Sequence, residues 1–176
     1  EKIMSIPLSD ASIKTYMQLL PAASNIMSKA RAHFEENGTD LQEIVQMKLY
    51  EDMATFAFQI FSIMHHSVGA INALKEGEFA PPNMPKGLSF QELQDILSNA
   101  EQELSEVSAE EINNLAGKSV IFKMGSIEMP FTSEDFILSF SLPNFYFHVT
   151  TMYDMLRIKG LPIGKFDFVG QMRVSQ

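Results

Sequence analysis

Cysteine is absent from this chain, and basic residues are scarce. Without cysteine there is no disulfide, no thiolate metal site and no cysteine nucleophile, and such an absence is usual in the reducing cytoplasm. Lys and Arg number 13 against 22 Asp and Glu, which gives a formal net charge of −9. Phosphate backbones and anionic lipid headgroups would repel a chain this acidic. We therefore expect no nucleic-acid partner and no membrane partner.

Long apolar segments are also missing. No hydrophobic run approaches the ~20 residues that a membrane-spanning helix requires. Residues 1–7 lack an apolar signal core followed by a small-residue cleavage site. Together with the missing cysteines, this predicts a cytoplasmic protein. Hydrophobic residues nevertheless make up 45% of the 176 residues. This is enough for one core, so we expect a single domain over residues 1–176.

Several catalytic motifs are absent as well. The chain has no Gly-rich loop between a strand and a helix, no Gly-x-Ser-x-Gly and no Glu-x-x-His. These absences argue against a nucleotide-phosphate cradle, a hydrolase nucleophile elbow and the carboxylate-bridged metal pair of di-iron bundles. The sequence leaves open whether the protein is an enzyme.

Helical periodicity dominates what is present. Apolar residues at helical spacing predict long helices over about residues 9–36 and 52–77, from residue 89, and over 132–160. Pro21 should kink or break the first of these because it cannot donate the helix hydrogen bond. Capping boxes predict helix starts at Thr39, Ser89 and Ser108, each followed by Gln or Glu three residues on. Residues 78–87 contain three prolines and are typical of a rigid surface connection.

The periodicity changes from helical to alternating over residues 120–124 and 127–131. Gly125 and Ser126 lie between these two segments, which predicts a β-hairpin with a type II′ turn and its apolar face on the helices. Phe166 and Phe168 should pack back onto the same core. The sequence therefore predicts an all-α fold, a four-helix bundle with a small β-hairpin before the last helix.

A polar line follows one face of the predicted last helix. Its members are spaced i, i+3, i+7 and i+10 and therefore share that face: Ser141, Asn144, His148 and Thr151. The helix over residues 52–77 has its own polar stripe of Asp52, Gln59, Ser62 and His66. We call the following six residues the polar seam: Ser141, Asn144, His148, Thr151, Gln59 and Ser62. Buried polar groups need partners, so a seam inside a bundle indicates either a satisfied network or a binding site.

The last helix and the residues after it resemble a bacterial family of unknown function that is grouped with the DinB/YfiT-like superfamily. The resemblance covers essentially the whole chain. It is carried by residues 142–157, 160–165 and 167–170, with Asp10-Ala-Ser12 and Glu51-Asp-Met53 earlier in the chain. It implies a four-helix bundle that is usually oligomeric. Members of the wider superfamily hold a divalent metal with three histidines, and some are thiol-dependent transferases or hydrolases.

The resemblance also places metal ligands on this sequence. Leu156-Arg157 follows His148 at the superfamily's spacing, so His148 matches the second ligand and Asn144 stands at the first ligand position. The third ligand would come from the second long helix, as His66 with His65 as a substitute. An Asn carbonyl is a weak ligand for zinc or nickel, whereas imidazole suits both.

Each of these residues also has a structural interpretation. Asn144 and His148 can bond each other or a facing helix. His65 shares a face with Phe58 and Phe61 and is expected to be a packed histidine. The stripe that contains His66 fits solvent exposure as well as it fits a pocket.

Two functional hypotheses follow. In the first, the chain is a metal-site-degenerate, non-catalytic protein that binds a small molecule or forms oligomers. In the second, it is a divalent-metal-dependent thiol transferase or hydrolase that uses His148 and a histidine of the second long helix. In either case we expect a homodimer. The last helix carries more aromatic surface than one bundle seam needs, through Phe136, Phe140, Phe145, Tyr146, Phe147 and Tyr153.

Overall fold

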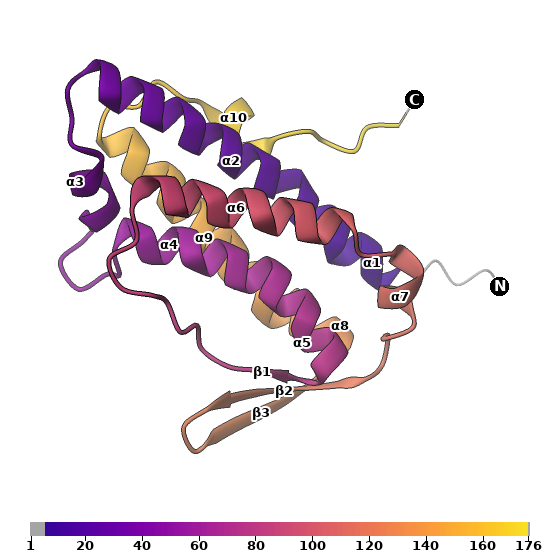
Figure 1. Cartoon of the computed structure of the whole chain (residues 1–176). Helices are drawn as coiled ribbons and strands as arrows, with labels where there is room; N and C mark the ends of the chain where they lie inside the picture. The colour runs from indigo at the N-terminus through magenta and orange to yellow at the C-terminus, as the bar shows by residue number, and fades with distance from the viewer. Residues whose placement is uncertain (1–5, 176) are drawn as a thin grey trace.

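The computed structural model describes residues 6–175, mostly as helices, with a small sheet along one side (Figure 1). The α-helices are α1 (Leu8–Ala11), α2 (Ile13–Glu36), α3 (Leu41–Gln46), α4 (Phe56–Met64), α5 (Ala70–Glu76), α6 (Phe90–Ser105), α7 (Ala109–Asn113), α8 (Ser133–Asp135), α9 (Leu142–Ile158) and α10 (Lys165–Val169). Two π-helical segments are η1 (His65–Gly69) and η2 (Phe136–Ser141). The strands are β1 (Glu78–Phe79), β2 (Ser119–Met124) and β3 (Ile127–Thr132).

The core lies between α2, α4, α6 and α9, which run side by side in Figure 1. Helix α2 packs on α6, and α4 packs on both α6 and α9, while α2 and α9 also touch. Four large aromatic side chains of α2, α4, η2 and α9 are fully buried: Tyr16, Phe56, Phe136 and Phe145. Burial of each such side chain contributes roughly 1.5–3 kcal/mol. None of the helices within residues 6–175 is long and apolar enough to cross a membrane.

The first predicted helix is interrupted, but not where the sequence indicated. Ser12, with φ −101° and ψ −85°, separates α1 from α2. Helix α2 then continues through Pro21, so the break considered for that residue is wrong. A proline in a helix costs about 3 kcal/mol, but its neighbours Leu20 and Ala22 are buried in the core. Packing of α2 against α6 therefore holds the helix together across the proline.

Two of the predicted helix starts need correction. Asp40, not Thr39, caps α3, because its side chain accepts a hydrogen bond from the Gln42 amide at 2.9 Å. Helix α4 begins after Thr55 rather than near Asp52, and Asp52 lies in the turn before it. The predicted caps at Ser89 and Ser108 are confirmed, the former as a complete capping box.

The two long helices that carry the polar seam are each interrupted by a π-helical segment. Segment η1 lies between α4 and α5, and η2 lies between α8 and α9. Neither segment was predicted. In a π-helical turn the hydrogen bond spans one residue more than in an α-helix, and such turns occur frequently at functional sites.

The sheet contains the predicted hairpin and one unexpected strand. Strands β2 and β3 pair antiparallel. Gly125 has φ 60°, whereas Ser126, like every other non-Gly residue of the described chain, has negative φ. A type II′ turn requires this combination. Residues 78–87 are not only a connection, because β1 pairs parallel with β2. The result is a mixed three-stranded sheet in the order β1-β2-β3, not a lone hairpin.

The hairpin packs on the helices through β2 and, on β3, through Phe131, which contacts Phe136 and Phe140. Val120 and Phe122 of β2 are buried, together with Phe79 of β1. Ile127 and Met129 of β3 are exposed, which corrects the expectation that the apolar face of β3 covers the core. In the order β1-β2-β3, β2 is the central strand and β3 is an edge strand.

The two phenylalanines of α10 differ in their packing. Phe168 of α10 packs edge-on against Tyr153 with ring centroids 5.8 Å apart, as predicted. Phe166 is 84% exposed, so its predicted packing is wrong. The helix is only five residues long and turns just one face to α2, so Phe166 remains on the outer face.

Candidate functional site

The structure brings His66 of η1 and His148 of α9 together in the core. Both are buried, and their rings stack at an 18° interplanar angle with centroids 5.8 Å apart. Phe58, Phe79 and Phe140 pack around this pair with centroid distances between 5.4 and 6.1 Å. Gln59, Ser62 and His66 of the polar stripe are therefore buried rather than facing solvent, whereas Asp52 is exposed.

Gln59 fixes the orientation of His148. The Gln59 Nε2 donates to the backbone oxygen of Ala54 at 3.3 Å, so its Oε1 faces His148 Nδ1 at 2.8 Å. An amide oxygen only accepts, and His148 must therefore carry its proton on Nδ1. The lone pair of this imidazole is then on Nε2.

A second network begins at Tyr16 of α2 and ends in η1. The Tyr16 hydroxyl lies 2.6 Å from Ser141 Oγ, and Ser141 Oγ donates to the backbone oxygen of His66 at 2.7 Å. Since the single hydroxyl proton of Ser141 is used on His66, Tyr16 is the donor to Ser141. Both side chains are fully buried. Burial raises the pKa of Tyr16, so its hydroxyl remains protonated.

Two polar atoms near the histidines are buried without a hydrogen-bond partner. They are Ser62 Oγ and His66 Nδ1, on side chains that are 1% and 7% exposed. Each costs about 1–3 kcal/mol if nothing satisfies it. Within residues 6–175, the fold provides no hydrogen-bond partner for these two atoms.

The histidines are neutral at physiological pH. Burial, reinforced by the neighbouring His65 and His148, lowers the pKa of His66 to about 3. Burial and the nearby His65 lower the pKa of His148 to about 4. The pKa of His65 is also lowered, chiefly by burial. The cluster is therefore uncharged and presents lone pairs and N–H groups rather than positive charge.

The other predicted residues lie apart from this pair. Asn144 is half-buried, and its Nδ2 donates to the backbone oxygen of Phe140 in its own helix at 2.8 Å, not to His148. His65 donates Nε2–H to the backbone oxygen of Ala80 at 2.8 Å and stacks on Phe79, as expected of a packed histidine. Thr151 is buried.

The donors present do not match a three-histidine metal site. Within residues 6–175, no three His, Asp or Glu side chains come together as a metal site requires. His66 and His148 converge, and the orphaned His66 Nδ1 is a free nitrogen. Asn144, at the first ligand position, is half-buried and bonds its own helix through Nδ2, and its remaining Oδ1 is a weak ligand for zinc or nickel. Zinc sites keep at least three protein ligands, so this site lacks one.

Sequence analysis missed Tyr16 and assigned Gln59 no definite partner. Tyr16 and Ser141 are 125 residues apart, and Gln59 and His148 are 89 apart. Tyr16 is a buried aromatic on an amphipathic helix, and nothing in its local pattern distinguishes it from a core residue.

Comparisons with known proteins agree on family and fold. A family model described as "Domain of unknown function (DUF1993)" matches residues 8–169. A crystal structure of a DinB family member from Shewanella denitrificans is similar, with a TM-score of 0.79 and 23% sequence identity. The similarity covers 96% of this chain and 95% of that one. No curated protein matches.

Proposed function

Because the chain belongs to the DUF1993 family and has a DinB-like fold, we propose that it is a DinB-type four-helix bundle whose metal site has degenerated and that it works without catalysis. The observation that carries this proposal is the incomplete donor set, with two converging imidazoles and an Asn144 that bonds its own helix. The absence of cysteine further supports a cytoplasmic location.

In this proposal the polar seam is a structural network. The bond from Gln59 to His148 joins α4 to α9, and the bonds from Tyr16 through Ser141 to His66 join α2, η2 and η1. Buried networks of this kind fix one arrangement of helices, because any other arrangement leaves polar groups unpaired. His148 and Ser141 thus each tie two helical segments together, through the Gln59 side chain and the His66 backbone.

Metal content tests the proposal directly. Elemental mass spectrometry on tag-free protein, before and after incubation with excess zinc or nickel, should give well below one ion per chain. His148→Ala and His66→Ala should not change that value. Near-stoichiometric metal that disappears in both variants would refute degeneracy.

One observation favours a second function, a divalent-metal-dependent thiol transferase or hydrolase. His66 and His148 lie together in the core instead of far apart, and His66 Nδ1 is unpartnered. Stoichiometric metal in the same experiment would support this function and would justify a screen for thiol transfer. A thermal shift with zinc that is lost in His66→Ala would give the same answer without an activity assay.

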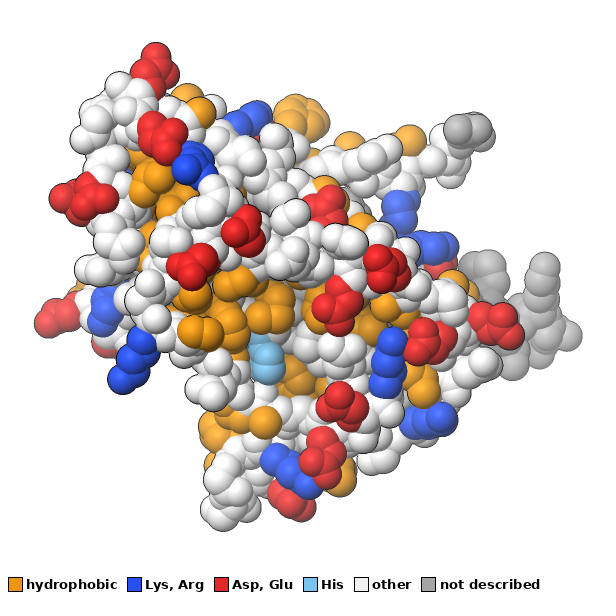
Figure 2. Space-filling view, viewed as in Figure 1, with side chains coloured by type: hydrophobic (Ala, Val, Ile, Leu, Met, Phe, Trp, Pro, Cys, Tyr) orange, Lys and Arg blue, Asp and Glu red, His pale blue; other side chains and the backbone are white. Residues whose placement is uncertain are grey.

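A homodimer through α9 is the second part of the proposal. Residues 136–153 contain no charged residue in a chain of net charge −9. Pro143, Tyr146, Phe147 and Thr150 are exposed and recur at i, i+3, i+4 and i+7, so they form one uncharged face. Aromatic enrichment and charge depletion mark the core of an interface. On the face seen in Figure 2, acidic side chains lie over α6, which contains four of them.

Light scattering at micromolar concentration tests the dimer. We expect the mass of two chains for the wild type and of one chain for Phe147→Glu. Phe166→Glu is the matched control, because Phe166 is 84% exposed on α10 and lies outside the uncharged face. A monomeric wild type, or a dimer that Phe147→Glu leaves intact, would contradict this part of the proposal.

A further inference from the structure

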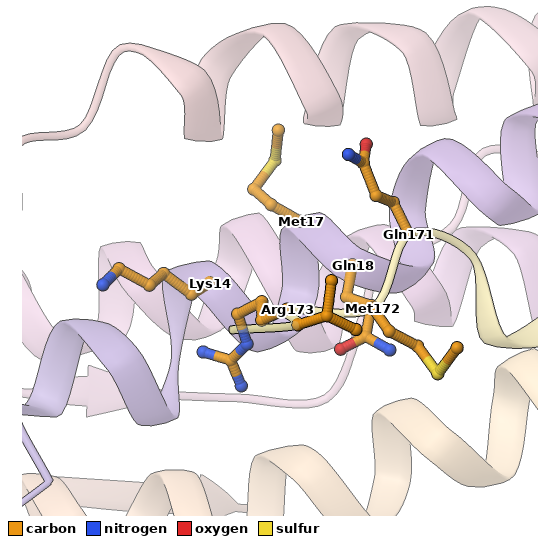
Figure 3. A pocket seen from close by; sticks show the side chains of 7 residues that line it. Lys14, Met17, Gln18, Gln171, Met172 and Arg173 are labelled. Atoms are coloured by element: carbon orange, nitrogen blue, oxygen red, sulfur yellow. The ribbon is translucent and has the colours of Figure 1, made fainter. Parts of the chain in front are cut away.

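A cavity lies between α2 and the C-terminal segment, away from the histidines (Figure 3). Its volume of about 470 Å³ is within the range of small-molecule pockets. Seven residues line it: Lys14, Met17, Gln18, Gln171, Met172, Arg173 and Val174. Acidic residues outnumber basic ones in this chain by 22 to 13, yet two basic residues and no acidic residue line the cavity.

The C-terminal segment is held over α2 by specific contacts on both sides of the cavity. Gln18 Nε2 donates to the backbone oxygen of Val169 at 2.9 Å, and Arg173 Nη1 donates to the backbone oxygen of Asp10 at 3.2 Å. Gly170 has φ 60°, and a Cβ at this position would lie 2.5 Å from the backbone oxygen of Gln18. The segment therefore needs glycine there to approach α2 so closely.

The charges at this cavity are only partly compensated. Lys14 forms an ion pair with the Asp10 carboxylate at 2.6 Å. Arg173 contacts only the backbone of Asp10, and none of the ion pairs within residues 6–175 includes it. Its guanidinium lies close enough to Tyr146 to counteract the burial that raises the pKa of that phenol. Among the described residues, the cavity thus contains one guanidinium that forms no ion pair, in a strongly acidic protein.

The rest of the lining is apolar or amide. Met17, Met172 and Val174 supply flexible, polarizable and aliphatic surface, and methionine adapts to ligands of varied shape. Gln18 and Gln171 add amide groups. A planar guanidinium matches a carboxylate through two parallel hydrogen bonds. The apolar side chains would cover a short hydrocarbon or aromatic portion of the same ligand.

From this arrangement we propose that the cavity between α2 and the C-terminal segment binds a small organic carboxylate with an apolar portion. Arg173 binds the carboxylate, assisted by Lys14, and Met17 and Met172 cover the apolar portion. This inference does not rest on the histidine pair, since no residue of the cavity belongs to the polar seam. No lining residue belongs to the uncharged face of α9 either, although Arg173 lies near Tyr146 of that face.

Calorimetric titration of the full chain with hexanoate tests the proposal. Hexanol, which has the same chain length without the charge, and acetate, which has the carboxylate without the chain, are the comparison probes. We expect hexanoate to bind at least ten-fold more tightly than either. Equal affinity for hexanol and hexanoate, or no detectable binding of hexanoate at millimolar concentration, would overturn the proposal.

Three variants localise the site. Arg173→Gln should weaken hexanoate binding at least ten-fold, whereas Lys159→Gln, an identical charge change at an exposed residue outside the cavity, should leave it unchanged. Gly170→Ala should also weaken binding, because it lifts the segment without altering any lining side chain. Both Arg173 and Gly170 lie outside the core, and a retained circular dichroism spectrum will verify folding. Unchanged binding in Arg173→Gln would place the ligand elsewhere and refute the assignment.

Discussion

Ser141 connects two buried groups, so its removal should cost more than the loss of one hydrogen bond. In Ser141→Ala, the Tyr16 hydroxyl loses its acceptor and the His66 backbone oxygen loses its donor, and both remain buried. Each unsatisfied buried group costs about 1–3 kcal/mol. We therefore expect a loss of about 3 kcal/mol, a large share of the roughly 5–15 kcal/mol that stabilises a typical domain.

Tyr16→Phe is a milder change at the same network. It leaves Ser141 free to donate to His66 and keeps the edge-on packing of the ring against Phe145 at 5.1 Å. We expect a loss of about 0.5–1.5 kcal/mol, the net value of one hydrogen bond. The double variant should cost less than the sum of the single ones, because the phenylalanine ring then leaves no unpaired hydroxyl facing the new alanine.

Urea unfolding followed by circular dichroism measures all three variants. Ser139→Ala is the control, an exposed serine on the same π-helical segment, and it should stay within ~0.5 kcal/mol of wild type. Independent sites add within about 0.3–0.5 kcal/mol. If the two losses of unfolding free energy add within that limit, or if Ser141→Ala costs less than Tyr16→Phe, the two hydroxyls do not form one network.

Three further predictions follow from the site and its supports. Burial lowers the pKa of His66 to about 3 and that of His148 to about 4, from 6.5, so below pH 6.5 the unfolded chain binds more protons than the folded one. The free energy of unfolding should therefore be highest above pH 6.5 and fall as the pH drops toward 4. Equal stability at pH 7 and pH 4.5 would contradict the assigned burial. Asp40→Ala should destabilise the protein by about 1 kcal/mol through loss of the α3 cap, while Thr39→Ala should have no effect in thermal unfolding, the opposite of what the sequence pattern alone predicts. Ser62→Ala should be neutral or stabilising by chemical denaturation, because it removes a buried hydroxyl without a partner; a clear loss of stability would mean that something satisfies that hydroxyl.

Local signals in the sequence predict local features of the fold. The capping box at Ser89 depends on side chains within three residues of one another, and the turn at Gly125 depends on the one residue type that adopts positive φ without strain. Both appear where the sequence places them. The choice between Thr39 and Asp40 failed because either side chain can cap, and only the final path of the loop decides between them.

Features that depend on contacts between distant residues could not be predicted in this way. Strand β1 exists only because β2, about 40 residues later in the chain, offers it an edge. The helical spacing placed Gln59 in the seam without saying that it bonds His148, and it left out Tyr16, because both contacts join residues that are distant in the chain. The helical pattern places His148 and Asn144 on one face. It does not indicate that the His148 side chain bonds Gln59 in the core while the Asn144 amide bonds the backbone of its own helix.

The two π-helical segments also constrain how the length of this chain can change during evolution. A π-helical turn contains one residue more than the α-helical turn it replaces, so η1 and η2 each act as a single-residue insertion within a long helix. A change of η2 to an α-helix without loss of a residue would rotate the remainder by about 100°. His148 would then turn away from Gln59. The facing of His148 therefore depends on the π-helical turn of η2, and a homologue that lacks the extra residue should have a plain α-helix there and keep the same histidine pair.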